Sequence, residues 1–266
     1  MTGAAAWTVA VLGFGEAGAD IAAGLASSGF RVRGFDPVAP TPAGVEQAAS
    51  DADACSGADL VLSLTTAAEA EVALRQSLGA LTDAAGATVY ADANTAAAGL
   101  KQRLAGIAAD AGVPFADIAI MAPVPGLGYR VPMLVSGTGA QRTSEILSEC
   151  DARVEVLPGP AGLAATRKLL RSVFYKGMAA ALVEALLAAR SAGCEDWLRD
   201  HLSAELADAD ATTLARLENG SYRHALRRSH EMAAATELLG ELGVPPRMAH
   251  ASQIWLQDLA DQSSGR

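Results

Sequence analysis

The chain has 266 residues, of which 51% are apolar and 5% aromatic, and its formal net charge at pH 7 is −10. This length accommodates one large or two modest domains with an aliphatic core. The acidic balance argues against a nucleic-acid partner, which needs a basic face. The 3 cysteines and 4 histidines form no disulfide framework and no metal-ligand spacing. We therefore expect no metal site and a reduced, cytoplasmic protein.

A glycine-rich turn follows the first apolar run. Residues 7–12 are apolar, as in a buried parallel strand, and residues 13–18 read Gly-Phe-Gly-Glu-Ala-Gly. This G-x-G-x-x-G pattern between a predicted strand and a predicted helix at 16–27 is the dinucleotide-binding fingerprint. The alternative is a glycine-rich helix start without a cofactor. The residues expected to contact the cofactor are Gly13, Phe14, Gly15, Glu16, Ala17 and Gly18.

A carboxylate, Asp36, ends the second apolar run at 30–35. In the fingerprint an acidic residue stands about twenty residues after the turn, where it accepts hydrogen bonds from the ribose hydroxyls. The same carboxylate would repel a 2′-phosphate. Asp36 therefore favours NAD over NADP.

Apolar runs and helical segments alternate through the first half of the chain. Further strands are predicted at 60–64, 88–91, 115–120, 132–136 and 153–157, with helices at 67–78, 96–111 and 140–150. This alternation predicts βαβ units and a doubly wound, mostly parallel α/β sheet of the Rossmann type.

Pro158-Gly159-Pro160 ends the alternation, and only helical patterns follow, at 162–192, 195–207, 209–217, 222–242 and 246–261. Gly193, Gly220 and Gly243 are expected to separate them. We predict a dinucleotide-binding domain over 1–158 and an all-α domain for substrate binding and dimerisation over 159–266.

The helix predicted at 162–192 is rich in alanine and leucine around its circumference. One small domain cannot cover so much apolar surface, so we expect a homodimer. Its most apolar part, from Lys176 to Arg190, is interrupted and bounded by charged residues at less than spanning length, so no membrane association is expected.

Four stretches carry a family resemblance: the glycine turn, Asp92-Ala93-Asn94-Thr95, the segment from Asp117 to Gly126, and the segment from Gly162 to Lys168. They resemble the cofactor turn, the D-x-S-T substrate loop, the D-A-P-V-S-G-G segment and the G-x-G-x-x-x-K motif of the β-hydroxyacid dehydrogenase family. That family includes 3-hydroxyisobutyrate and 6-phosphogluconate dehydrogenases. The resemblance implies that Lys168 is the catalytic lysine.

Two departures from the family pattern stand out. Asn94 replaces the serine of D-x-S-T, and the asparagine pair of K-x-x-N-N is Arg171-Ser172. The chain is thus similar to a divergent branch of phosphogluconate-dehydrogenase-like oxidoreductases, and this resemblance implies the fold and cofactor of the family rather than its named substrates.

The resemblance implies an enzyme, an NAD(P)-dependent dehydrogenase that moves a hydride between nicotinamide and a small anionic β-hydroxy acid or its phosphorylated relative. Alcohol oxidation also releases a proton, and Lys168 is the predicted general acid/base. Arg171 and Ser172 lie three and four residues later, on the same helix face. Arg171 would clamp a substrate carboxylate or phosphate, and Ser172 would orient the lysine or the substrate hydroxyl.

Loop residues after the predicted strands complete the expected site, because ligands bind at the carboxyl ends of parallel strands. Asn94 is expected to contact the cofactor, and the family resemblance implies the same for Thr65, because in that family this sheet edge passes the cofactor. Asn94, Thr95 and Gly126 are expected to contact the substrate. Thr95 could instead cap a helix, and Gly126 could be only a turn glycine.

Two functional alternatives stay open: an imine reductase-like enzyme, which usually carries Asp or Tyr at the lysine position, and a non-catalytic dinucleotide-binding protein. A basic cluster on a late helix contains Arg223, His224, Arg227, Arg228 and His230. It is either a solvated or subunit-interface face, or an anion site completed by a partner subunit.

Overall fold

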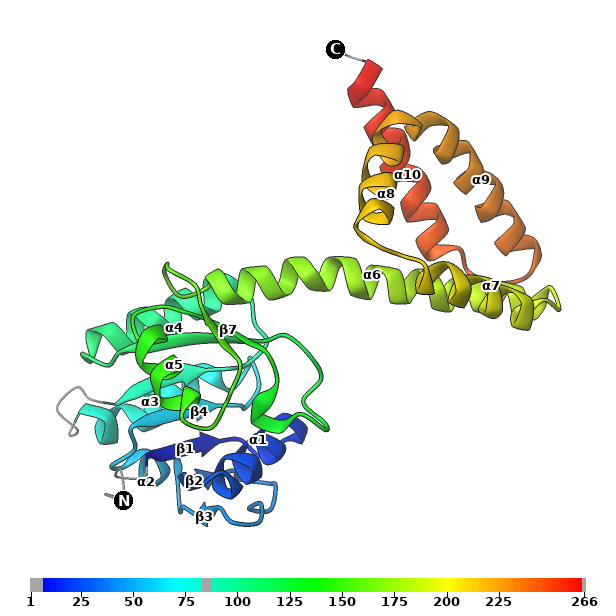
Figure 1. Ribbon diagram of the computed structural model, residues 1–266. Coiled ribbons are helices and arrows are strands. Elements are labelled where there is room, and N and C mark those ends of the chain that lie inside the picture. Colours follow the sequence, from blue (N-terminus) through cyan, green and yellow to red (C-terminus); the bar gives the residue numbers. More distant parts are fainter. Residues whose placement is uncertain (1–6, 83–87, 265–266) are drawn as a thin grey trace. The chain divides into compact units, whose positions relative to one another are not determined.

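The computed structural model describes residues 7–82 and 88–264. The chain divides into two compact units, residues 1–171 and 172–266 (Figure 1). The predicted boundary after residue 158 marks the place where strands end, whereas the division between the compact units lies within a long helix, α6 (Leu163–Ser191).

The first unit is built around one sheet, which has 8 strands among the described residues, in the order β3-β2-β1-β4-β5-β6-β7-β8. All neighbouring pairs are parallel except β6 and β7, so the predicted mostly parallel Rossmann sheet is confirmed. The strands are β1 (Thr8–Leu12), β2 (Arg31–Phe35), β3 (Glu46–Gln47), β4 (Leu60–Ser63), β5 (Val89–Asp92), β6 (Phe115–Ile120), β7 (Met133–Ser136) and β8 (Val154–Val156).

The connecting helices are α1 (Glu16–Ser27), α2 (Asp51–Cys55), α3 (Ala70–Thr82), α4 (Ala98–Asp110), the 3-10 turn η1 (Gly128–Arg130) and α5 (Ala140–Ser148). The bounds of α1 and β6 are those predicted. The short elements β3, α2 and η1 were not predicted, because they span too few residues to show a periodic pattern.

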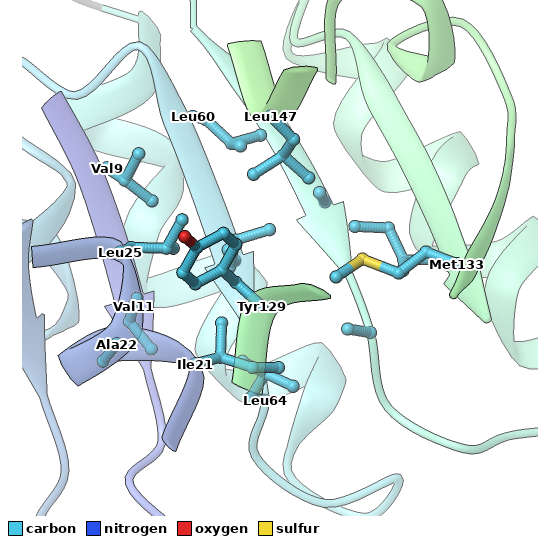
Figure 2. Packing of buried hydrophobic residues seen from close by; sticks show 14 of the residues in the cluster. Val9, Val11, Ile21, Ala22, Leu25, Leu60, Leu64, Tyr129, Met133 and Leu147 are labelled. Carbon is cyan, nitrogen blue, oxygen red and sulfur yellow. The ribbon is translucent and has the colours of Figure 1, made fainter. Parts of the chain in front are cut away.

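Successive residues of β1 point alternately into two different cores, because side chains alternate along a strand and this sheet is covered on both faces. Val9 and Val11 pack with Ile21 and Leu25 of α1 (Figure 2), whereas the intervening β1 residues join a second core with α3 and α4. Because the sheet is buried on both sides, the free edge for ligands is the row of loops at its carboxyl end.

The helical region continues from α6 through α7 (Glu195–Ala207), α8 (Ala211–Arg223), α9 (Ala225–Glu241) and α10 (Arg247–Ser264). The prediction of a helix end at 217 and a new helix from 222 was wrong. Gly220 lies inside α8, and the break falls at His224, which ends α8 and begins α9.

The helix α6 has 29 residues and contains an 18-residue window of mean hydropathy 1.4, of which 11% is buried. By length and composition it could cross a membrane, so the expectation that this segment is too short is corrected. The expectation rested on counting only from Lys176 to Arg190, whereas the helix begins at Leu163.

Candidate cofactor and substrate site

The glycine turn between β1 and α1 has three glycines with different physical roles. A β-carbon on Gly18 would lie 2.1 Å from the Gly13 carbonyl oxygen, so Gly18 permits the close packing of helix and strand. Gly13 has a φ of 93° and its β-carbon would lie 2.6 Å from the Leu64 oxygen. Around Gly15, by contrast, a β-carbon would meet nothing within 4 Å.

Gly15 is also the N-cap of α1, and no side chain caps that helix end. The first backbone N–H groups of a helix lack partners within the helix and carry the positive end of its dipole. The open space at Gly15 therefore fits an anionic group, such as a dinucleotide pyrophosphate.

Asp36 anchors this turn with both carboxylate oxygens. Its Oδ2 accepts a hydrogen bond from the Phe14 N–H at 2.7 Å, and its Oδ1 accepts from the two backbone N–H groups that follow Pro37. Burial works to raise the pKa of Asp36, but these three N–H groups outweigh burial and lower it. Asp36 is thus an ionised part of the turn, a role that motif reading did not reveal.

Phe14 contributes its backbone to the turn and its ring to the core. Phe14 is 4% exposed, and a β-carbon on Gly34 would lie 2.5 Å from its ring. Glu16 is exposed and Ala17 half-buried at the start of α1. The three non-glycine positions of the turn therefore have different environments.

A cavity of about 480 Å³ opens beside the turn, at the carboxyl ends of β1, β2 and β4. We call it the cofactor cavity. Its lining contains three carboxylates, Asp36, Asp51 and Glu69, and no lysine or arginine. Burial and the nearby charge of Asp36 raise the pKa of Asp51. The other lining residues are Gly13, Gly15, Phe35, Pro37, Leu64, Thr65, Thr66, Val72, Ala73 and Gln76.

The ends of β4 and β5 meet at Asn94, which is 6% exposed. Its Nδ2 lies 2.7 Å from Asp92 Oδ2, 3.2 Å from Thr65 Oγ1 and 3.3 Å from Ser63 Oγ. Thr65 also lines the cofactor cavity. Two predicted site residues, Asn94 and Thr65, are thus brought together at the edge of that cavity.

Lys168, on the second turn of α6, reaches the loop after β5. Its Nζ donates a hydrogen bond to Thr95 Oγ1 at 2.8 Å, although the two residues are 73 positions apart. Because Thr95 directly follows Asn94, contacts run from the cofactor cavity through Thr65, Asn94 and Thr95 to the lysine.

The other predicted substrate residues have separate positions. Arg171 is exposed and Ser172 half-buried, three and four residues after Lys168 in α6. Gly126, with a φ of 82°, lines a cavity of about 660 Å³ that shares no lining residue with the cofactor cavity. This second cavity is bounded by η1 and α1 residues such as Tyr129 and Asp20.

A buried charge cluster beneath this loop was missed by sequence reasoning. Lys101 of α4 is 0% exposed, and its Nζ donates to the Asp92 carboxylate and, at 2.8 Å, to the Asp92 carbonyl oxygen. It also lies 3.3 Å from Asp117 Oδ1. Both carboxylates are at most 1% exposed. We call these three residues the buried triad.

The buried triad connects the Asn94 loop to the start of α6. Asp92 holds Asn94, while Asp117 Oδ2 accepts hydrogen bonds from the N–H groups of Gly162 at 2.9 Å and Ala165 at 3.0 Å. One carboxylate, Asp117, is therefore the partner of two backbone donors at the start of α6. The available sequence signal was the position of Lys101 on the inward face of α4, three residues before buried Leu104.

Comparisons with known proteins agree with this architecture. Residues 8–150 match the model of a family described as the NAD binding domain of 6-phosphogluconate dehydrogenase, and residues 189–259 match a domain of unknown function, DUF1932. None of the curated proteins matches the chain.

Several solved structures resemble the whole chain. A conserved hypothetical protein from Sinorhizobium meliloti 1021 is 30% identical, with 94% of this chain and 87% of that chain covered and a TM-score of 0.61. A conserved protein of unknown function, described as similar to 3-hydroxyacid dehydrogenases, is 27% identical, with 96% and 98% covered and a TM-score of 0.60.

An imine reductase variant from Myxococcus stipitatus, in complex with NAD+, is 17% identical, with 97% and 95% covered and a TM-score of 0.78. This likeness concerns the fold. Because the family model spans more than half of the chain, the protein belongs to the family that carries the NAD binding domain of 6-phosphogluconate dehydrogenase, with the NAD(P)-binding oxidoreductase fold of the 3-hydroxyacid dehydrogenases.

Proposed function

We propose that the protein is an NAD-dependent dehydrogenase that oxidises the CH–OH group of a small β-hydroxy acid, with Lys168 as general acid/base. The observation that carries the proposal is the Lys168–Thr95 hydrogen bond of 2.8 Å, beside an asparagine whose partner Thr65 lines the cofactor cavity. A proton-transfer group is thereby linked to the place where a nicotinamide cofactor fits.

The residues of the turn and the cofactor cavity fit the dinucleotide. The pyrophosphate would bind at Gly15 and the N–H groups of α1, with the ribose at Asp36. A carboxylate has about four acceptor positions, and three backbone N–H groups use Asp36, so its Oδ2 can accept one ribose hydroxyl.

The charges in the cavity favour NAD over NADP. A phosphate monoester carries a charge of roughly −1.5 to −2 near pH 7, and the cavity lining offers it carboxylates and no cation. The low pKa of Asp36 keeps one of those carboxylates ionised. A wild-type preference for NADP in binding or turnover would overturn this part of the proposal.

The nicotinamide accepts or donates the hydride when it is bound. The chain's own residues handle the proton: the neutral Lys168 amine takes it from the substrate hydroxyl during oxidation, and the ammonium returns it to the carbonyl oxygen during reduction. Thr95 holds the lysine Nζ in place, and Asp92 orients the Asn94 amide toward the same loop. Fixing such groups in position before reaction lowers the barrier.

A small anionic substrate needs local cations, because the chain carries a net charge of −10. We assign the binding of its carboxylate or phosphate to Arg171, with Ser172, Thr95, Asn94 and Gly126 as further substrate contacts. Arginine suits this role because its planar guanidinium forms bidentate hydrogen bonds with a carboxylate or a phosphate.

The test replaces Lys168 with methionine and follows NADH fluorescence with short 3-hydroxy acids, using NAD and NADP separately. We expect turnover to fall by about 10²–10⁴-fold, the usual contribution of general acid/base catalysis, with unchanged NADH binding. Lys176→Met is the matched control, since Lys176 is exposed on the same helix. Normal turnover in Lys168→Met, with activity lost in Lys176→Met, would show that the assignment is wrong.

Imine reduction is the second candidate, because structures of imine reductases superpose on nearly the whole chain with TM-scores of 0.77 and 0.78. The lysine at 168 argues against it. Turnover of cyclic imines with NADH, in the absence of hydroxy-acid oxidation, would favour this candidate. Binding of NADH without turnover of either substrate class would indicate a non-catalytic dinucleotide-binding protein.

We also propose a cytoplasmic homodimer in which a second copy covers apolar side chains of the helical region. Leu170, Val173 and Val183 of α6 are 65%, 74% and 57% exposed in the single chain. Exposed apolar side chains repeated along one helix are typical of an interaction surface. A monomeric mass in light scattering, or recovery of the protein in the membrane fraction, would contradict this proposal.

A further inference from the structure

The helical unit contains a cavity of about 720 Å³ whose charged side chains are all basic, although the chain as a whole is acidic. It lies where α8 and α9 join. Three arginines and a histidine line it, and no carboxylate does. We call it the arginine cavity; its lining is Arg216, Asn219, Gly220, Tyr222, Arg223, His224 and Arg228.

The arginines of this cavity differ from others in the same unit. Arg190 and Arg199 pair with Glu195 at 2.6 and 2.9 Å, and Arg227 lies 3.4 Å from Glu231. Within the described part of the chain, Arg216 and Arg223 have no carboxylate within ion-pair distance. Like charges held together without a counter-ion repel each other, so an anion in the cavity would be stabilised.

The guanidinium of Arg228 is positioned by a hydrogen bond to a neighbouring helix, which would orient its other N–H donors before a ligand binds. Its Nη1 donates to Ser221 Oγ at 3.0 Å, and the residue is half-buried. Gly220 makes room for it, because a β-carbon there would lie 2.6 Å from Arg228 Nη2. This close approach explains a glycine inside α8, where alanine would favour the helix more.

The helix dipoles do not determine the sign of the electrostatic potential in the arginine cavity. His224 is both the C-cap of α8 and the N-cap of α9. The negative end of one helix therefore meets the positive end of the other, and the two effects oppose each other. The guanidinium groups set the sign of the local potential.

We propose that the arginine cavity binds the phosphate group of a small soluble ligand. Guanidinium groups bind phosphate through paired N–H donors, and the Asn219 amide and Tyr222 hydroxyl add neutral donors to the same cavity. The site lies at the α8–α9 junction, and the proposal makes no use of the dehydrogenase chemistry proposed above.

The first experiment titrates inorganic phosphate into the full-length protein by calorimetry, at constant ionic strength and with saturating NAD so that the glycine turn is occupied. We expect one phosphate per chain, binding that weakens as salt is raised, and a higher melting temperature with phosphate. Phenyl phosphate tests a soluble ester, and vesicles with phosphatidic acid test a lipid source. Binding to the vesicles alone would overturn the proposal of a soluble ligand.

Three variants locate the site. Arg223→Gln and Arg228→Gln should each weaken phosphate binding about tenfold. This factor is what the loss of one charge-assisted hydrogen bond costs when solvent screens part of the interaction. Arg227→Gln is the matched control, since Arg227 is adjacent in α9 but outside the cavity lining, and it should leave binding unchanged.

Gly220→Ala separates binding from folding. Its β-carbon must displace the Arg228 guanidinium, while alanine favours the helix. We expect an equal or higher melting temperature together with weaker phosphate binding. If phosphate binding is absent, or if it is the same in all four variants, the proposal is wrong.

Discussion

Replacing Lys101 with methionine tests how much the buried triad contributes to the fold. Methionine has a similar length, so the change removes the charge while leaving most of the volume filled. The carboxylates of Asp92 and Asp117, at 1% and 0% exposed, then lose the cation between them. Breaking such a buried pair from one side costs about 3–5 kcal/mol, because a charge is left uncompensated in the interior.

Set against a typical unfolding free energy of about 5–15 kcal/mol, this loss is severe. It corresponds to a fall in melting temperature of about 6–20 °C for a chain of this size. Because Asp117 also accepts from the N–H groups of Gly162 and Ala165, we expect the start of α6, and with it the Lys168–Thr95 contact, to loosen.

The assay is urea unfolding followed by circular dichroism, with a thermal melt on the same samples. Arg103→Met is the matched control: it removes one exposed positive charge from the same helix, α4, and should shift stability by about 0.5 kcal/mol or less. The double variant Lys101→Met/Asp117→Asn should recover part of the loss, since it removes one of the uncompensated charges.

A Lys101→Met protein within about 1 kcal/mol of wild type would refute this reasoning. So would a double variant whose loss equals the sum of the two single losses, because that result would mean that the two side chains do not interact.

Further predictions concern the turn, the thiols and a surface carboxylate. Gly18→Ala should destabilise the fold by about 1–3 kcal/mol through overpacking. The added β-carbon of Gly15→Ala meets no protein atom within 4 Å, so this variant should melt like the wild type but bind NADH more weakly. Equal melting temperatures for the two variants would contradict this prediction. Burial raises the pKa of the Cys55 thiol to about 12, so at pH 8 a thiol reagent should label exposed Cys194 at once and Cys55 only after unfolding. Hydrogen bonds from two arginines lower the pKa of Glu195 to about 2. Its stabilising effect should therefore be present above its unfolded pKa and disappear as pH falls toward 2, and a carboxyl NMR titration with a midpoint near the ordinary value of about 4.3 would contradict this.

The local elements of the first unit follow from sequence patterns. The bounds of α1 and β6 are predictable because apolar periodicity and a glycine turn act over a few neighbouring residues. The same is true of the turn itself, where Gly13 and Gly18 occupy positions that exclude a β-carbon. Sequence reasoning was wrong at Gly220, because a glycine can mark either the end of a helix or a place where another group approaches closely. Gly220 lies inside α8, where the Arg228 side chain approaches it.

By itself, the sequence determined the alternating α/β half, the helical half, and the dinucleotide fingerprint with its acidic residue. Only the tertiary structure decided which distant groups meet: Lys168 with Thr95, and Lys101 with Asp92 and Asp117. The physical reason is that a lysine on a helix is ordinarily solvated, and its burial between two carboxylates depends on strands brought together by the whole sheet. The periodicity of a sequence indicates which face of a helix or strand is buried, but it does not indicate which charged side chain of another element that face contacts.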